Sequence, residues 1–284
     1  MIFNWIHSED KSSFKPIGDF VTSNLSLANR FNQFDISNLV GTDVLPVIDE
    51  VILTKLMHSI IARNLDTDSI MSVVEKRRTS AWYEDYSYFY EGIYQVALMN
   101  KFYESHLNGF HHVTAKDMWD TYTSDYYQMD SYYREFHNAF SICLQTIHPS
   151  LDDDFKDIAD YVEKEYKNWY LDKVATNWNK VIEDDLSSTG KITGLTQQTD
   201  FYQDVVKKID GKVFVIISDA MRYDVAHSLA RQLEIETKAD VSISAQQGIF
   251  PTITKFGMAA LLPHKKLETV VQNDSVKVLV DGHA

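Results

Sequence analysis

Hydrophobic positions over roughly the first 186 residues recur every three or four positions, which is the spacing of one face of an α-helix. Helices are predicted from about residue 13, from Pro46, after Asp66, over about 82–107, from Thr114 and over 151–186. Prolines and polar caps mark several of these starts. No strand pattern interrupts the series, so an all-α N-terminal region is predicted.

The pattern changes near residue 208. A short helix over 197–208 leads into an unbroken apolar run at 213–218, and helical spacing resumes at Arg222. Further strands are predicted near 239–245 and 276–280, with a helix at about 255–262 between them. Alternating strands and helices with an apolar first strand are typical of a parallel α/β sheet.

Two domains are therefore predicted. A helical domain covers 1–208, with a linker at about 187–196 that is rich in Ser, Thr and Gly, and the opening part of an α/β domain covers 209–284. The predicted fold class is thus mixed within one chain, all-α followed by parallel α/β.

Composition indicates a folded protein with an acidic surface. The chain is 44% hydrophobic and 13% aromatic, and its formal net charge is −14. Such a charge repels phosphate backbones, so nucleic-acid binding by the helical region is not expected. Its tyrosines and tryptophans could stack on bases, but their helical spacing favours the core of a helical bundle.

The single cysteine, Cys143, excludes an internal disulfide and a thiolate metal site. Its apolar surroundings in the sequence predict a buried small hydrophobe. The N-terminus lacks the pattern of a signal peptide, and no apolar run has the length of a membrane span, so a cytoplasmic protein without membrane association is predicted.

Asp219 directly follows the apolar run at 213–218. Ligands of open parallel sheets bind beyond the carboxyl ends of the strands, where a carboxylate suits a metal or phosphate site. Aspartate is also a favoured cap of a following helix, and spacing alone leaves both interpretations open. Arg222 and Asp224 are expected to start that helix and to face solvent or form a local pair.

A second candidate is the segment Pro251-Thr252-Ile253-Thr254, which precedes a helix rich in small residues. A hydroxyl at a helix N-terminus lies among free N–H groups that favour phosphate. An ordinary threonine cap would look the same. The pairing with Asp219 favours the functional interpretation.

Two competing motifs fail. A phosphate-binding loop would need glycine at Asp185 and Ser or Thr at Ile192, and the serine-hydrolase motif would need glycines around Ser218. The histidines give weaker signals. His264 and His283 follow the α/β elements and could approach a site there, but no spacing fixes them near it.

The segments 213–223 and 250–263 are both present, and the spacing between them is similar to that in the PglZ family. The chain therefore resembles this family. This family belongs to the alkaline phosphatase superfamily, and its best-known members act in BREX phage-exclusion systems. Asp281-Gly282 after an apolar strand also resembles the family, as does Arg77-Arg78 with Trp82 less specifically. The resemblance is strong over about 210–284 and weak over 1–208.

The resemblance implies that Asp219 is a ligand of a divalent metal, zinc first and Mg or Mn as alternatives. It implies that Thr254 is the nucleophile and a second metal ligand, which suits chemistry in which a metal activates a hydroxyl. The parent protein is then a metal-dependent phosphatase or phosphodiesterase of bacterial phage defence. Its partners would be other defence proteins, such as a methyltransferase or an ATPase.

The resemblance also implies further Asp and His ligands from later strands, which this sequence does not contain. Asp219 and Thr254 supply at most two ligands, whereas a zinc site needs three or more. A fragment that is inactive alone is therefore expected. The alternative is a non-catalytic scaffold whose helical part docks other phage-defence proteins.

Overall fold

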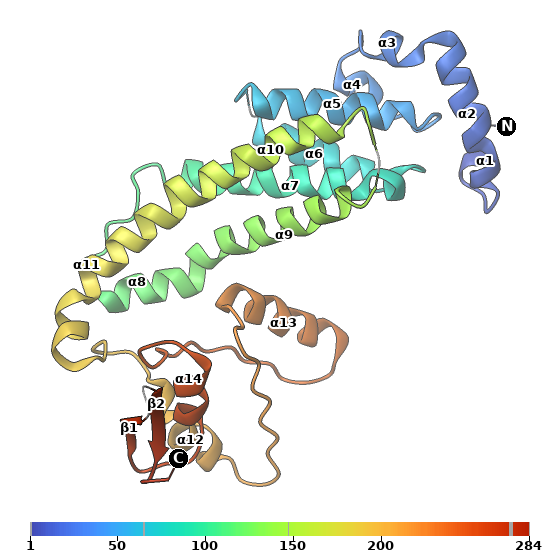
Figure 1. Cartoon of the computed structure of the whole chain (residues 1–284). Helices are drawn as coiled ribbons and strands as arrows, with labels where there is room; N and C mark the ends of the chain where they lie inside the picture. The colour runs from blue at the N-terminus through green and yellow to red at the C-terminus, as the bar shows by residue number, and fades with distance from the viewer. Residues whose placement is uncertain (1, 65, 147, 273–274, 284) are drawn as a thin grey trace. The chain divides into compact units, whose positions relative to one another are not determined.

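The computed structural model describes residues 2–64, 66–146, 148–272 and 275–283 (Figure 1). The chain forms two compact units, one of Met1–Phe110 with Met129–Lys173, and the other of His111–Gln128 with Val174–Ala284. These units are defined by compactness, whereas the predicted boundary near 208 rests on a change of pattern along the sequence. That boundary stays a prediction.

All the regular secondary structure in the described residues of the first unit is helical, as predicted. Its helices are α1 (Ile2–Ile6), α2 (Lys11–Leu25), α3 (Leu27–Phe31), α4 (Ile36–Leu39), α5 (Val47–Ile61), α6 (Thr67–Arg77), α7 (Tyr83–Ser105), most of α9 (Tyr127–Cys143), α10 (Asp152–Lys164) and the π-helix η2 (Glu165–Leu171). Helix α5 packs against α7 and α10, and α6 packs against α7.

Caps that the sequence predicted are present. Asp66 precedes α6, and its Oδ1 accepts a hydrogen bond from the backbone N–H of Ser69 at 3.0 Å. Thr114 likewise precedes α8 (Ala115–Thr121) and accepts from the N–H of Asp117 at 3.1 Å. Each bond satisfies one of the backbone donors that a helix start leaves unpaired.

Aromatic side chains fill the core of the first unit, which confirms that the helically spaced aromatics belong to the bundle. Phe89, Phe136 and Phe155 are fully buried, and the rings of Phe89 and Phe155 meet edge-on with centroids 5.0 Å apart. Cys143 is buried, and burial raises the pKa of its thiol to about 12. These contacts explain the aromatic content without a base-stacking role.

Two residues from the weaker part of the resemblance have structural partners. The guanidinium of Arg77 is 1% exposed and pairs with the buried Asp49, at 2.7 Å between Nη2 and Oδ2. The indole N–H of Trp82 donates to the carbonyl of Asp43 at 2.8 Å. Because breaking a buried ion pair is costly, Arg77 fixes the packing of α6 on α5.

The long helix predicted over 151–186 is present as α10, η2 and α11 (Asp172–Thr189) in succession. The π-turn of η2 widens the helix locally, which periodicity alone does not reveal.

The second unit contains α8, the π-helix η1 (Tyr122–Tyr126), α11, α13 (Tyr223–Glu236) and α14 (Thr254–Leu261). The predicted helix at 197–208 is broken into η3 (Gln198–Asp200), α12 (Phe201–Asp204) and η4 (Val206–Lys208). Residues Ile192 and Leu195 of the predicted linker are buried with Ala115 and Ile182, so part of the linker is packed.

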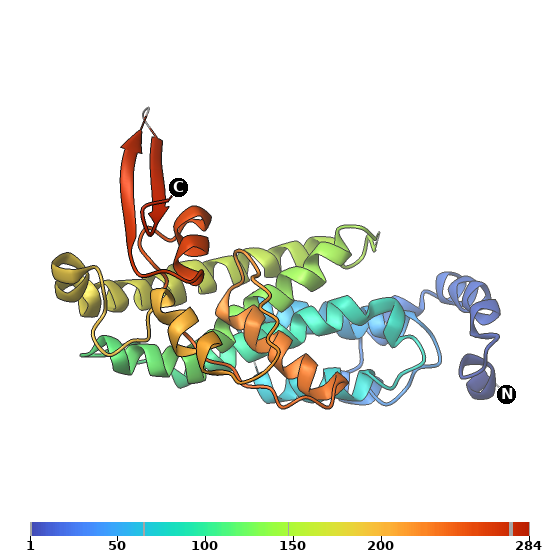
Figure 2. The ribbon, with the colours of Figure 1, turned by 90° about the horizontal axis from the view of Figure 1, so that it is seen from below.

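The sheet differs from the prediction. Strands β1 (Leu267–Gln272) and β2 (Ser275–Val280) form an antiparallel hairpin in which Leu267 pairs with Val280 (Figure 2). The strand predicted at 276–280 is therefore present, but it is antiparallel, and β1 was not predicted.

The strands predicted at 213–218 and 239–245 are not in a ladder within the described residues. Phe214 is 80% exposed and Ile216 93% exposed. A parallel strand that is apolar on both faces needs neighbouring strands and a covering layer on each side, and residues 213–218 have neither among the described residues. The parallel sheet consequently stays a prediction.

Within the described residues, no helix combines the length and the apolar character that crossing a membrane requires.

Candidate active site

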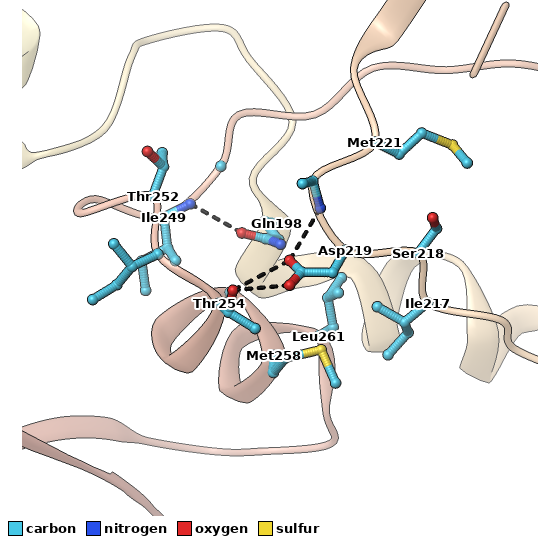
Figure 3. Close-up of a pocket in the computed structure, with 14 residues that line it drawn as sticks. Gln198, Ile217, Ser218, Asp219, Met221, Ile249, Thr252, Thr254, Met258 and Leu261 are labelled. Carbon is cyan, nitrogen blue, oxygen red and sulfur yellow. Dashed lines mark hydrogen bonds between the residues drawn. The ribbon is translucent and has the colours of Figure 1, made fainter. Parts of the chain in front are cut away.

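Two segments that are distant in the sequence line one cavity of the second unit. The turn at 217–221 and the segment at 248–254 with the first turns of α14 surround a volume of about 570 Å³, and Gln198 completes the lining (Figure 3). Cavities of this size hold small ligands. It contains both residues that the sequence singled out.

Asp219 lies in a turn between the extended segment 213–218 and α13. Its Oδ1 accepts a hydrogen bond from the N–H of Ala220 at 3.0 Å, and Ala220 has a left-handed φ of 56°. Helix α13 starts later, with Arg222 as its N-cap residue. Asp219 therefore does not cap this helix. Arg222 and Asp224 make the expected local pair, at 3.2 Å between Nε and Oδ1.

Thr254 is the first residue of α14, and the N-cap position belongs to Ile253. The Thr254 hydroxyl donates to the Asp219 carboxylate, with Oγ1 at 3.0 Å from Oδ2 and 3.2 Å from Oδ1 (Figure 3). The preceding Phe250–Pro251 peptide bond is cis. The structure thus brings together two side chains that are 35 positions apart.

Gln198 is a site residue that the sequence did not reveal. Its Oε1 accepts a hydrogen bond from the N–H of Ile249 at 3.1 Å, just before the Pro-Thr-Ile-Thr segment (Figure 3). The Gln198 side chain also packs against α14 at Gly257, where a Cβ would lie 3.4 Å from its Nε2, an ordinary contact distance. Gln198 therefore ties the strand-like loop at 248–249 to α14. No spacing or motif in the sequence marks this glutamine.

Polar and apolar side chains share the wall of the cavity. Asp219 and Thr254 are exposed to solvent, and Ile217, Met258 and Leu261 form the sides. The positive end of the α14 dipole lies at Thr254 and favours an incoming anion. Chemically, the arrangement presents an oriented hydroxyl beside a carboxylate, both within reach of a ligand.

The cavity contains part of a binding site for a divalent metal. The Asp219 carboxylate and the Thr254 hydroxyl are hard oxygen donors that face each other, which fits two positions of a zinc or magnesium shell. In the part of the chain that the structure describes, no group of three or more His, Cys, Asp or Glu side chains could hold a metal ion. The donor set fits the metal but does not complete its shell.

The two downstream histidines are not among the residues that line the cavity. The Nδ1 of His264 is 2.7 Å from the carbonyl of Leu262, and the backbone of His283 bridges to Val280. Asp281 accepts from the backbone N–H groups of Lys265 and Lys266, both at 2.8 Å, and these bonds hold the pKa of its carboxyl below the usual value. Asp281 thereby closes the base of the hairpin.

Comparison with known proteins shows which family and which relatives this chain is similar to. Residues 200–284 match the family described as the BREX system PglZ alkaline phosphatase-like domain. Over 281 residues, or 98% of the chain, it is 30% identical to the alkaline phosphatase-like protein PglZ of Bacillus cereus (strain H3081.97), of which it covers 32%. Over 247 residues, or 83% of the chain, it is 31% identical to the alkaline phosphatase-like protein BrxZ of Escherichia coli O9:H4 (strain HS), of which it covers 28%.

The chain thus spans about a third of the length of these curated relatives. No solved structure matches it.

Proposed function

Because the chain belongs, through residues 200–284, to the PglZ family of alkaline phosphatase-like domains, we propose that it contributes part of the active site of a metal-dependent phosphatase or phosphodiesterase. The relatives' names place them among alkaline phosphatase-like proteins, and the matching family is that of BREX systems. The proposed setting is therefore bacterial phage defence.

The hydrogen bond between Thr254 and Asp219 carries the proposal. Asp219 orients the Thr254 hydroxyl at the mouth of the cavity, where a phosphorus atom could be reached. Both carboxylate oxygens face the hydroxyl, which fixes its rotation. Such preorganisation lowers the entropic cost of nucleophilic attack.

In the proposed reaction, Thr254 Oγ1 forms a bond to the phosphorus of a phosphoester while the bond from phosphorus to the leaving oxygen breaks. The hydroxyl proton departs along the hydrogen bond toward Asp219. The leaving oxygen departs as an alcohol with a proton from solvent, and Asp219 returns its proton to solvent. Water then attacks the phosphorus of the phosphothreonine, which releases the phosphate and restores the Thr254 hydroxyl. The N-terminus of α14 favours the negative charge of the phosphoryl group in both steps.

A bound divalent cation, zinc first and Mg or Mn as alternatives, would lower the pKa of the hydroxyl and neutralise phosphate charge. Asp219 and Thr254 would hold it, together with ligands from outside the described residues. Because these two side chains are too few for a complete shell, we propose that the 284-residue chain alone is inactive.

A second candidate function is a scaffold that docks other phage-defence proteins, such as a methyltransferase or an ATPase. The exposed apolar side chains of Phe214 and Ile216 favour it, since contiguous exposed apolar surface is typical of contact sites. The two functions are compatible in one protein.

Hydrolysis of a generic phosphodiester and a generic phosphomonoester, with Zn, Mn or Mg, tests the enzymatic proposal in the longest natural protein that contains this chain. Asp219→Asn and Thr254→Val should each lower kcat by a factor on the order of 1000, because each removes a group that acts in the transition state. Asp240→Asn and Thr269→Val, which change exposed residues away from the cavity, are the matched controls.

If Thr254→Val retains wild-type kcat with every metal, Thr254 is not the nucleophile. A wild-type protein that binds no metal and hydrolyses neither substrate would favour the scaffold.

A further inference from the structure

The cavity around Asp219 and Thr254 has few side-chain donors for the negative charge of a phosphoryl group. Among the described residues that line it, none is Lys, Arg or His, and Gln198 is the one whose side chain contains nitrogen. The Asp219 carboxylate in the same wall repels an anion, and the Thr254 hydroxyl already donates to that carboxylate. Gln198 is therefore the natural candidate for a side-chain donor to phosphate.

The hydrogen bond with Ile249 fixes the orientation of the Gln198 amide. The Ile249 N–H donates to Oε1 at 3.1 Å. Because the carbonyl oxygen is the only acceptor of an amide side chain, the nitrogen must occupy the other end. Figure 3 shows the oxygen toward Ile249 and the nitrogen on the side of Asp219. This is the side chain's only hydrogen bond to the described residues, so both hydrogens of Nε2 stay available to solvent or to a ligand.

The nitrogen end of the amide lies beside the first turn of α14. A Cβ at Gly257 would be 3.4 Å from Nε2, and Gly257 follows Thr254 by three positions. Residues three positions apart in a helix share one face. The amide nitrogen thus lies along the face of α14 that carries the Thr254 hydroxyl, where a phosphoryl group attacked by Oγ1 would be placed.

The backbone holds Gln198 in this position without a ligand. The Gln198 N–H donates to the carbonyl of Gln247 at 2.9 Å, and the Gln247 N–H donates to the carbonyl of Thr196 at 2.7 Å. These bonds form a parallel bridge between Gln197 and Gln247, and Gln247 is 4% exposed. A donor that is fixed in advance stabilises developing charge with little reorganisation.

We propose that Gln198 is a catalytic residue whose Nε2 donates a hydrogen bond to a non-bridging oxygen of the phosphoryl group in the transition state. This inference rests on the proposed function, in which Thr254 is the nucleophile. Charge in the transition state is spread over the non-bridging oxygens, where a fixed donor is most effective. The bond from Ile249 to Oε1 keeps the amide from turning its oxygen toward the phosphate.

Gln198→Glu separates the two ends of the amide in the longest natural protein that contains this chain. The carboxylate has nearly the same size and still accepts from the Ile249 N–H, but an ionised carboxylate has no hydrogen to donate. The kcat for a phosphomonoester and a phosphodiester should fall by a factor on the order of 100, as expected for the loss of one preorganised donor.

A second pair of variants makes the same comparison without the acceptor. Gln198→Lys and Gln198→Met both lose the bond from Ile249, and only the lysine can donate. The lysine variant should therefore keep a kcat at least about tenfold above that of the methionine variant. Gln203→Glu and Gln203→Lys are the matched controls for the added charges, because Gln203 is an exposed residue of α12. Both controls should have the wild-type kcat.

Thermal unfolding of each variant identifies any that fail to fold, and if Gln198→Glu is one of them, the comparison of lysine with methionine decides. If Gln198 only anchors the loop at 248–249, Gln198→Glu keeps the wild-type kcat and the lysine and methionine variants are equal. Either result in an active protein, or an effect confined to KM, overturns this inference alone. A wild-type protein that hydrolyses neither substrate with any metal overturns the proposed function and this inference with it.

Discussion

Thr254 and Asp219 form a pair in which a single hydroxyl hydrogen faces two carboxylate oxygens. The hydroxyl is thereby oriented before any substrate arrives. Asp219 is itself held by the N–H of Ala220, in a turn whose left-handed residue is Ala220. Orientation of the Thr254 hydroxyl, the proposed nucleophile, therefore depends on the backbone of the 219–220 turn as much as on the two side chains.

Glu165 gives a prediction at the same scale. Burial raises the pKa of its carboxyl above the ordinary 4.5, with the Tyr161 hydroxyl and Arg63 acting in the opposite direction. Glu165 lines a cavity of the first unit, together with the titratable groups of Tyr103, Glu104 and Lys164. Folding then favours the protonated form, so the contribution of Glu165 to stability is greatest below pH 4.5 and is lost as pH rises through the raised pKa.

Glu165→Gln should remove this loss. Urea unfolding of the wild type and the variant across this pH range measures it, because other groups titrate equally in both proteins. The free energy of unfolding of the variant, relative to that of the wild type, should increase as pH rises. A difference that is constant with pH would contradict the prediction.

Residue types and their positions in the sequence predicted part of the site. Asp219 after an apolar run and Thr254 before a helix could both be singled out from sequence, but their hydrogen bond required the fold. Gln198 could not be found, because a glutamine in a short helix is ordinary there. Its place in the site arises from neighbours distant in the sequence.

At the scale of elements, the helices of the first unit approach closely at Gly92 of α7. A Cβ at this position would lie 2.5 Å from Cζ and 3.1 Å from Cε2 of Phe155, which is fully buried. Glycine is disfavoured inside helices by about 1 kcal/mol relative to alanine. The close packing of α7 on α10 is a physical reason for glycine at position 92.

Gly92→Ala should therefore destabilise the protein by about 1–3 kcal/mol, because the overpacking exceeds the gain in helix propensity. Gly41→Ala, where a Cβ would meet no atom within 4 Å, is the control. Equilibrium unfolding in urea compares the two. A Gly92→Ala protein as stable as the wild type would show that Phe155 yields readily.

The helices themselves were largely predictable, and the sheet was not. Helical spacing, with caps such as Asp66 and Thr114, marks each start locally. Strand pairing is not local: the run at 213–218 has the composition of a buried strand, yet its pairing depends on partners elsewhere. The β-branched residues of β1, Val270 and Val271, did carry a strand signal, whereas the π-turns carry none in their spacing.

At the scale of the whole molecule, a substitution in the exposed apolar run at 213–218 should affect the stability of this chain and of a longer protein differently. Ile216→Asn should leave the stability of the 284-residue chain unchanged, because this side chain is 93% exposed. If residues 213–218 form a core strand of a parallel sheet in the longest natural protein, the same change should destabilise that protein by several kcal/mol, on the order of other buried polar substitutions.

Thermal and urea unfolding of both proteins measure this contrast. Ile52→Asn, at a fully buried position of α5, should destabilise both. Equal tolerance of Ile216→Asn in the two proteins would mean that the parallel sheet does not include this segment.

The central claim is that Asp219 and Thr254 act as one catalytic unit, and a double-variant cycle tests it most directly. In the longest natural protein, kcat/KM for a phosphoester is measured for Asp219→Asn, Thr254→Val and both together. If the two act as a unit, the double variant loses little more than the more damaging single variant. Losses that multiply, as those of independent sites do, would contradict the claim.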